Sequence, residues 1–152
     1  MTSSLKLDEY LPYRLSVASN EVSRLIARAY EDRFGLSVPQ WRVICVLAED
    51  GASTPQAIVA RTATDKVTVS RAAQALSTRR LVQRTPNSTD GRSHHLELTE
   101  TGRKLHADVT PLALRYEKEV IAGISLDEIT GFKKMLQRVE AVATRLAADS
   151  YK

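Results

Sequence analysis

Apolar positions in the first third of the chain recur in steps of three and four. Over residues 11–30 they form one stripe: Leu11, Leu15, Ala18, Val22, Leu25, Ile26, Ala29 and Tyr30. This period predicts an amphipathic helix, and Gly35 is a suitable residue to end it. A second apolar helix is predicted over residues 38–47, ending before Asp50, with inward positions at Trp41, Ile44, Cys45 and Leu47.

The next stretch predicts a short helix that begins in one of two ways. Ser53 with Gln56 three residues on fits a capping box, whereas Thr54 before Pro55 offers an alternative N-cap with proline in the first turn. The helix is expected to run through Arg61, where a polar break follows and Asp65 supplies a new N-cap.

The helix after Asp65 has one apolar and one polar face. Val69, Ala72, Ala73 and Leu76 share the apolar face, and at about 100° per residue the opposite face carries Val67, Ser70, Arg71, Gln74 and Thr78. The period then shortens to that of strands over residues 81–85 and 94–98, joined by the turn 87–91. Two short helices followed by a hairpin are typical of a winged helix-turn-helix.

Two long helices complete the chain. Thr99 caps the first, which carries apolar residues from Leu105 to Val120 at helical spacing; Pro111 should kink it and Gly123 should end it. A capping box at residues 125–128 opens the last helix, whose apolar positions are Ile129, Phe132, Leu136, Val139, Val142 and Leu146.

The terminal helices have too little neighbouring chain to cover their apolar stripes, so a second copy is expected to cover them. The predicted fold class is therefore mainly α with a small β-hairpin wing, forming an intertwined homodimer. We expect a single domain over residues 1–152, with dimerisation helices at 8–34 and 103–149 and a DNA-binding lobe at 38–102.

Charge is concentrated in one segment of the chain. The whole sequence of 152 residues has a net charge of +4, but residues 61–94 hold seven basic and two acidic side chains, a net charge of +5. The remainder is therefore close to neutral. A local basic segment on a helix and hairpin favours a polyanionic partner, here double-stranded DNA.

Several function classes are disfavoured. The sequence has one cysteine, no long apolar run and no signal-peptide pattern, so a cytoplasmic protein that does not enter a membrane is expected. It has no Cys/His nucleophile arrangement, no Gly-rich phosphate loop and no cluster of metal ligands, so we expect neither an enzyme, nor a cofactor, nor a metal site. The adjacent His94 and His95 would point to opposite faces of a strand.

The helix after Asp65 carries side chains suited to a major groove. Arg71 can bond both O6 and N7 of guanine, and Gln74 can pair with adenine. Val67 suits a thymine methyl group, Ser70 and Thr68 suit phosphate or base contacts, and Lys66 adds charge. Backbone N–H groups near Thr54 and Asp65 can hold phosphates. The alternative for Arg71 is a solvated surface residue.

In the hairpin, Arg92 can enter a minor groove while Asp90 orients its guanidinium, although Asp90 with Gly91 is also an ordinary hairpin turn. The competing function class is a winged-helix module that docks a protein instead of DNA. Such a module needs no concentrated basic segment.

The order of helices, the stretch 65–71 and the wing pattern Asp90-Gly91-Arg92 running to Leu98-Thr99-Glu100-Thr101-Gly102 resemble the MarR family of regulators. The resemblance covers roughly residues 10 to 147 and includes the stretch 40–43 of the second helix. It implies a homodimer that represses by binding a pseudo-palindromic operator. It also places Arg71 on a base-contacting position and Arg92 on the minor-groove position of the wing.

Arg80 departs from the family pattern, which has glycine at this position. A non-glycine residue there must either adopt a positive φ or end the helix differently. Members of the family commonly respond to small aromatic or phenolic acids. Tyr13, Arg14, Trp41 and Arg42 can supply an aromatic wall and a carboxylate anchor, with Arg14 preferred; the alternative for Arg14 is a salt bridge to the partner chain. Cys45, among apolar neighbours, is expected to be a buried, inert thiol.

Overall fold

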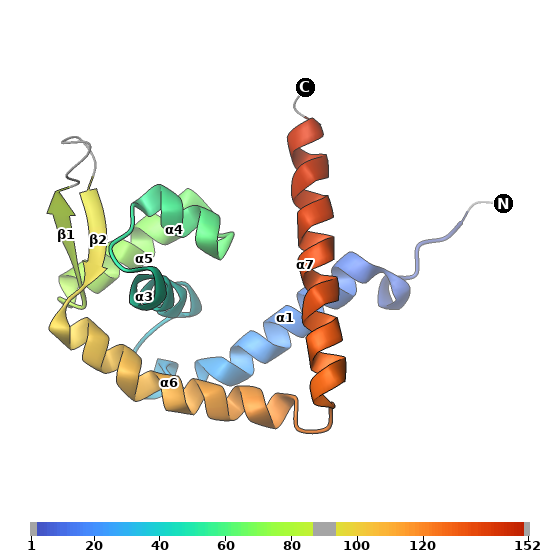
Figure 1. The fold of residues 1–152 in the computed structure, drawn as a ribbon, viewed down its shortest axis with the longest axis horizontal. Coiled ribbons are helices and arrows are strands. Elements are labelled where there is room, and N and C mark those ends of the chain that lie inside the picture. Colours follow the sequence, from blue (N-terminus) through green and yellow to red (C-terminus); the bar gives the residue numbers. More distant parts are fainter. Residues whose placement is uncertain (1–2, 87–93, 151–152) are drawn as a thin grey trace. The chain divides into compact units, whose positions relative to one another are not determined.

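The computed structural model describes residues 3–86 and 94–150. Its elements, in chain order, are η1 (Leu7–Glu9), α1 (Leu11–Ala27), α2 (Glu31–Phe34), α3 (Val38–Asp50), α4 (Pro55–Thr62), α5 (Lys66–Thr78), β1 (Val82–Pro86), β2 (His94–Leu98), α6 (Glu100–Val120) and α7 (Leu126–Asp149) (Figure 1). The predicted fold class, mainly α with one β-hairpin, is confirmed. The chain divides into two compact units, Met1–Tyr116 and Glu117–Lys152.

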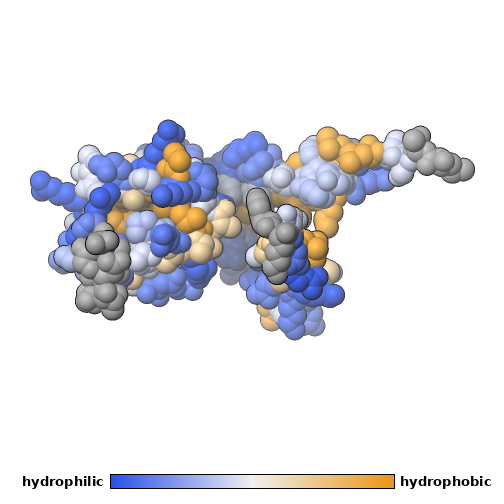
Figure 2. Space-filling view, turned by 90° about the horizontal axis from the view of Figure 1, so that it is seen from above, coloured by the Kyte–Doolittle hydropathy of each residue, from blue (hydrophilic) through white to orange (hydrophobic). Residues whose placement is uncertain are grey.

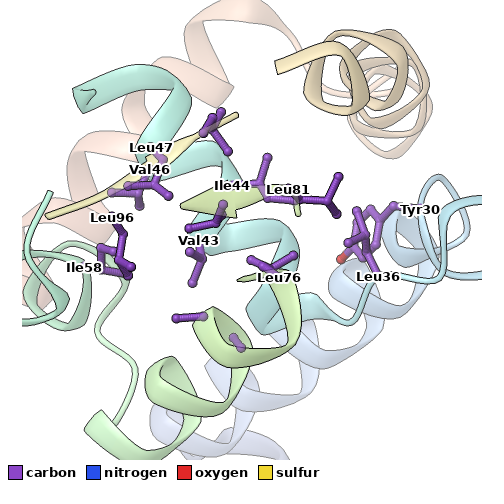
Figure 3. Packing of buried hydrophobic residues seen from close by; sticks show 14 of the residues in the cluster. Tyr30, Leu36, Val43, Ile44, Val46, Leu47, Ile58, Leu76, Leu81 and Leu96 are labelled. Carbon is purple, nitrogen blue, oxygen red and sulfur yellow. The ribbon is translucent and has the colours of Figure 1, made fainter. Parts of the chain in front are cut away.

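The core of the first unit lies between α3, α5 and the hairpin. Ile44, Ile58 and Leu76 are completely buried, and α4 and α5 both pack on α3 (Figure 3). The apolar face predicted for α5 is confirmed, because Val69, Ala72, Ala73 and Leu76 are each 4% exposed or less. This packing fixes the inner face of α5 and leaves its outer face in solvent.

The hairpin is antiparallel, with Val82 opposite Leu98 and Pro86 opposite His94. The strands begin within one residue of the predicted positions. Ser53 extends the sheet as an isolated bridge, since it exchanges two backbone hydrogen bonds with Leu96, of 2.9 and 2.8 Å. The loop before α4 is thereby tied to the strand β2.

The first predicted helix is broken, which corrects the expectation of one helix ending at Gly35. α1 ends at Ala27, and α2 resumes at Glu31 after a turn. The side chain of Tyr30, 2% exposed, lies against Leu36 in the core (Figure 3), and the N–H of Leu36 donates to the Tyr30 carbonyl at 3.1 Å. The backbone of Tyr30 leaves the helical path where this ring is buried, with φ of −137°, and Gly35 then ends α2 with a left-handed φ of 63°.

Other helix boundaries follow the caps in the sequence. Thr99 Oγ1 accepts from the N–H of Gly102, as expected of an N-cap, and the capping box of Ser125 and Glu128 is confirmed. α6 continues through Pro111 and ends at Val120 rather than at Gly123, and α3 extends to Asp50 rather than ending at residue 47.

Apolar side chains remain in solvent at the N-terminal segment of the first unit. Leu5, Leu7 and Leu11 are 65%, 51% and 56% exposed, and Figure 2 shows hydrophobic surface along this arm. Neighbouring exposed apolar side chains of this kind are common on surfaces through which proteins interact.

Arg80 takes the first of the two alternatives open to a non-glycine residue. Its φ is +59°, and α5 ends in a Schellman motif: Leu81 N–H donates to the Leu76 carbonyl and Arg80 N–H donates to the Ser77 carbonyl, each at 3.0 Å. The hinge between α5 and β1 therefore has the geometry that glycine would give, with an arginine in it.

Replacing Arg80 by glycine should raise the free energy of unfolding by about 1 kcal/mol, because the left-handed region costs an L-residue roughly 1–2 kcal/mol and glycine much less. The measurement is the urea midpoint at one fixed protein concentration. Gln74→Gly, in the right-handed interior of the same helix, is the control and should lower stability. A lower midpoint for Arg80→Gly would show that the strain is absent.

Candidate nucleic-acid interface

The start of α5 is fixed by Asp65. One carboxylate oxygen of Asp65 accepts from the backbone N–H of Thr68 at 2.8 Å, and the other accepts from the Thr68 hydroxyl at 2.7 Å. These two hydrogen bonds hold the pKa of Asp65 below its usual range. The predicted N-cap is confirmed. The Thr68 hydroxyl donates its proton to Asp65, so Thr68 can accept a hydrogen bond from a ligand but cannot donate one.

The outer face of α5 carries the side chains predicted to read DNA. Val67 is 58% exposed, and Lys66, Ser70, Arg71 and Gln74 are also exposed. Within the part of the chain that the structure describes, Lys66 and Arg71 have no ion pair and no side-chain hydrogen bond. Their charges are therefore available to a ligand outside this lobe.

The two alternatives for the start of α4 are resolved in favour of Thr54. Its hydroxyl accepts from the N–H of Ala57 at 3.2 Å, and Pro55 occupies the first turn. Ser53 is instead held in the bridge to β2. The turn between α4 and α5 contains Ala63 in the left-handed region, with φ of 50°. Thr54 thus serves as a cap. Pro55 has no N–H and that of Ala57 is bonded to Thr54, so the backbone N–H of Gln56 is the donor that this first turn can still offer to a ligand.

The basic segment divides into two groups in the structure. Arg61 pairs with Glu49 at 3.0 Å and with Asp50 at 3.3 Å, which ties α4 to α3. The Arg79 guanidinium donates to the carbonyls of Phe34 and Gly35. Both residues are occupied within the chain. Carbonyls are neutral, so Arg79 keeps its charge, and the exposed positive charges without an ion pair to a described residue in this segment are those of Lys66, Arg71, Arg79, Arg80 and Arg84.

The wing is described only for its two strands. Gln83 Nε2 on β1 donates to Glu97 Oε1 on β2 at 2.7 Å, a cross-strand pair on one face of the hairpin. Asp90 and Arg92, the predicted minor-groove pair, lie outside the described residues.

The four residues predicted to hold an aromatic acid come from two helices. Tyr13 and Arg14 lie on α1, half-buried and exposed respectively, and Trp41 and Arg42 lie on α3, again half-buried and exposed. Trp41 stacks on Tyr30 and on His106, with ring centroids 5.5 Å apart in each pair. Its ring is therefore engaged by two neighbours of its own chain. The sequence offered no signal for His106, because its place beside Trp41 depends on the packing of α6.

A hollow lies between the end of α3, strand β2 and the start of α6. Its volume is about 460 Å³, and its lining residues are Leu47, Ala48, Gly51, Ala52, Glu97, Leu98, Arg103 and His106. Arg103 donates to the carbonyl of Leu98 at 2.8 Å. Burial lowers the pKa of His106, so its imidazole is neutral near pH 7. None of Tyr13, Arg14, Trp41 and Arg42 lines this hollow.

Cys45 is partly exposed, which corrects the expectation of full burial. Burial on its inner side, together with the charge of Glu49, still raises the pKa of the thiol to about 11, so it remains a thiol at neutral pH. Cys45 lies on the inward side of α3, but the neighbouring elements do not bury its side chain completely.

No group of three or more His, Cys, Asp and Glu side chains among residues 3–86 and 94–150 is placed to hold a metal ion. Nor does any described helix have the length and hydropathy that crossing a bilayer requires.

Comparison with known proteins agrees with this geometry. The model of the MarR family matches residues 34–93, which include α3, α4 and α5. NicR of Pseudomonas putida, an HTH-type transcriptional repressor, is 26% identical over 147 residues, covering 90% of this chain and 90% of NicR.

Two solved structures share the fold. Bordetella bronchiseptica BpsR, whose structure concerns regulation of DNA binding by 6-hydroxynicotinic acid, has a TM-score of 0.82 at 23% identity, covering 91% of this chain and 98% of BpsR. A mutant of MarR from E. coli, complexed with operator DNA, has a TM-score of 0.79 at 22% identity, covering 90% of this chain and 99% of that one. The match to the family model, the similarity to NicR and the winged helix-turn-helix geometry together make this chain similar to regulators of the MarR family.

Proposed function

We propose that this protein is a sequence-specific, DNA-binding transcriptional regulator that acts as a repressor. The observation that carries the proposal is the outer face of α5, where Lys66 and Arg71 stand exposed without partners in the described chain, beside Val67, Ser70 and Gln74. A helix of this kind fits a major groove about 12 Å wide. NicR is a repressor, and the MarR mutant was solved with operator DNA.

Each residue of this face has a role in the proposal. Arg71 bonds guanine through two guanidinium N–H groups, and Gln74, one turn along, pairs with adenine. Val67 contacts a thymine methyl group. Ser70, Lys66 and the first turn of α4 beyond Thr54 contact phosphates and fix the register. Arg92, oriented by Asp90, enters the minor groove beside the site.

We propose that the operator is pseudo-palindromic and that the protein binds it as a homodimer. α7 has apolar side chains in solvent along one stripe: Phe132, Met135, Val139, Val142 and Leu146 are 41–56% exposed. A monomer rarely leaves such a stripe uncovered. A two-fold dimer would present two copies of α5 to half-sites about 34–36 Å apart.

DNA is favoured over a protein as the partner because the exposed charge is positive and concentrated. A docking module for proteins would need apolar or mixed surface on α5, whereas the exposed apolar residue of its outer face is Val67 alone among the described positions of that helix. The match of residues 34–93 to the MarR family model favours DNA in the same way and disfavours an enzyme.

A small aromatic acid is the proposed effector, with Arg14 as its carboxylate anchor and Tyr13, Trp41 and Arg42 beside it. BpsR provides the support, since its DNA binding is regulated by 6-hydroxynicotinic acid. The ligand would favour a dimer whose two α5 helices no longer match successive major grooves, which is a shift of population between two arrangements.

The test is selection of DNA fragments by the purified protein, with and without 6-hydroxynicotinic acid, 4-hydroxybenzoic acid and benzoic acid. We expect an enriched inverted repeat whose recovery falls with at least one acid. Arg14→Ala should raise the acid concentration required by about tenfold or more, through loss of a charge-assisted hydrogen bond. Arg28→Ala, at the C-cap of the same helix, is the control.

Two results would count against these proposals. Recovery of random fragments would contradict sequence-specific binding. An unchanged response in Arg14→Ala, with loss of response in Arg103→Ala, would move the effector to the hollow beside α6.

A further inference from the structure

Arg79 is the basic residue at the end of α5, yet its side chain is directed into the protein's own backbone. One guanidinium nitrogen donates to the carbonyl of Phe34 at 2.7 Å and the other donates to the carbonyl of Gly35 at 3.1 Å. These are the last carbonyls of α2 and its cap, which have no partner within a helix. A cation with two forked donors suits such a helix C-terminus.

The segment to which Arg79 is bonded, Phe34 and Gly35, is itself held in place by the core. Gly35 closes α2 in the left-handed region, and Leu36, 1% exposed, follows it into the core beside Tyr30. The N–H of Leu36 is bonded to the Tyr30 carbonyl. Arg79 therefore links the end of α5 to a fixed corner between α1 and α3, and not to a free loop.

The opposite side of the same helix end is held by the start of α6. The Thr99 hydroxyl donates to the Arg80 carbonyl at 2.7 Å, and the Thr99 N–H donates to the Leu81 carbonyl at 3.1 Å. The C-terminal end of α5 is thus bonded to two segments, one from α2 and one from α6.

We infer that Arg79 is a positioning residue for DNA recognition: it sets the orientation of α5 relative to the corner between α1 and α3, and through it the half-site spacing that the dimer accepts. The inference rests on the DNA-binding function proposed above. In this arrangement two of the five guanidinium N–H groups of Arg79 are bonded to backbone carbonyls, so the protein's own chain sets the direction of this side chain. Without the two hydrogen bonds of Arg79, α5 samples other orientations. The apparent affinity for DNA then falls in proportion to the fraction of molecules whose α5 is oriented for binding.

The experiment compares Arg79→Ala, Arg79→Lys and Lys66→Ala in the full-length protein on the selected operator. For each variant, the dissociation constant is measured across a salt series and across operators whose half-sites are moved apart or together by one and two base pairs. Circular dichroism at the assay temperature selects folded variants. Lys66→Ala is the matched control, since Lys66 carries the same charge but has no partner in the described chain.

We expect Arg79→Ala to bind about tenfold more weakly, with the salt slope of the unchanged protein and with a flatter dependence on half-site spacing. Arg79→Lys, which keeps the charge but reaches one carbonyl in place of two, should recover part of the affinity and of the spacing preference. Lys66→Ala should reduce the salt slope by about 1 and leave the spacing preference intact.

A reduced salt slope in Arg79→Ala with unchanged spacing preference would show a phosphate contact and overturn the inference, as would unchanged affinity. If Arg79→Ala does not fold, Arg79→Lys decides by its spacing profile alone. If the unchanged protein binds no DNA sequence in the selection, the proposed function fails, and that failure is distinct from a negative result for Arg79.

Discussion

Replacing Arg71 by alanine should weaken operator binding by about 10- to 100-fold and relax the preference at one base-pair position of each half-site. A bidentate contact from arginine to guanine contributes roughly 1–3 kcal/mol of discrimination, and tenfold corresponds to about 1.4 kcal/mol. Arg71 can make this contact because Val69, Ala72 and Ala73 bury the inner face of α5 and turn its side chain outward. The measurement is a binding titration on the selected operator and on single-base variants of it.

Comparison with Lys66→Ala distinguishes a contact that recognises a base from a contact that only attracts the phosphate charge. Lys66 is also exposed on the first turn of α5, and its loss should weaken binding to all sequences by a similar factor. If Arg71→Ala behaved in the same way, with every base preference retained, Arg71 would be a phosphate contact. Retention of both affinity and preference would return it to the class of solvated surface residues.

Replacing Gly102 by alanine should lower the free energy of unfolding by about 3 kcal/mol, the upper part of the range for overpacking. A Cβ atom at this position would lie 2.1 Å from the backbone oxygen of Leu81 and 3.2 Å from Leu98 Cδ2. That carbonyl cannot move away freely, because the Thr99 N–H is bonded to it. The first turn of α6 must therefore separate from the end of α5, or the cap at Thr99 must break.

Gly131→Ala is the matched control, since Gly131 also lies inside a helix and a Cβ atom there meets no atom within 4 Å. Alanine should raise stability at that position by up to about 1 kcal/mol. Urea unfolding followed by circular dichroism, at equal protein concentrations, measures both. A loss below about 0.5 kcal/mol in Gly102→Ala would mean that α6 can shift without cost.

This contact gives a physical reason for part of the wing pattern in the sequence. In the run from Leu98 to Gly102, Thr99 caps α6 by accepting from the N–H of Gly102, and Gly102 leaves room for the Leu81 carbonyl. The pattern could be found in the sequence, and its position after the second strand could be predicted. The partner that makes the glycine necessary, Leu81, could not be identified from local spacing.

Much of the fold was predictable for the same local reason. The N-caps at Asp65 and Ser125 and the two faces of α5 depend on residues within four positions of one another, so periodicity and capping rules reach them. The break at residues 28–30 was missed, because the apolar period continues through Tyr30. The structure interrupts the helix there and buries that ring against Leu36, a residue whose position the local period does not reveal.

The sequence by itself determined the helices apart from the break at residues 28–30, the hairpin, the outer face of α5 and a basic segment from Arg61 to Arg92. Only the tertiary structure decided how those basic side chains are held: Arg61 is paired with acids of α3, and Arg79 is bonded to carbonyls 44 and 45 positions away. The number of basic residues can be counted from the sequence, whereas the ion pairs and hydrogen bonds of each one depend on which groups lie beside it in the folded protein. Residues far apart in the sequence come within bonding distance of one another only when the core between α3, α5 and the hairpin has formed.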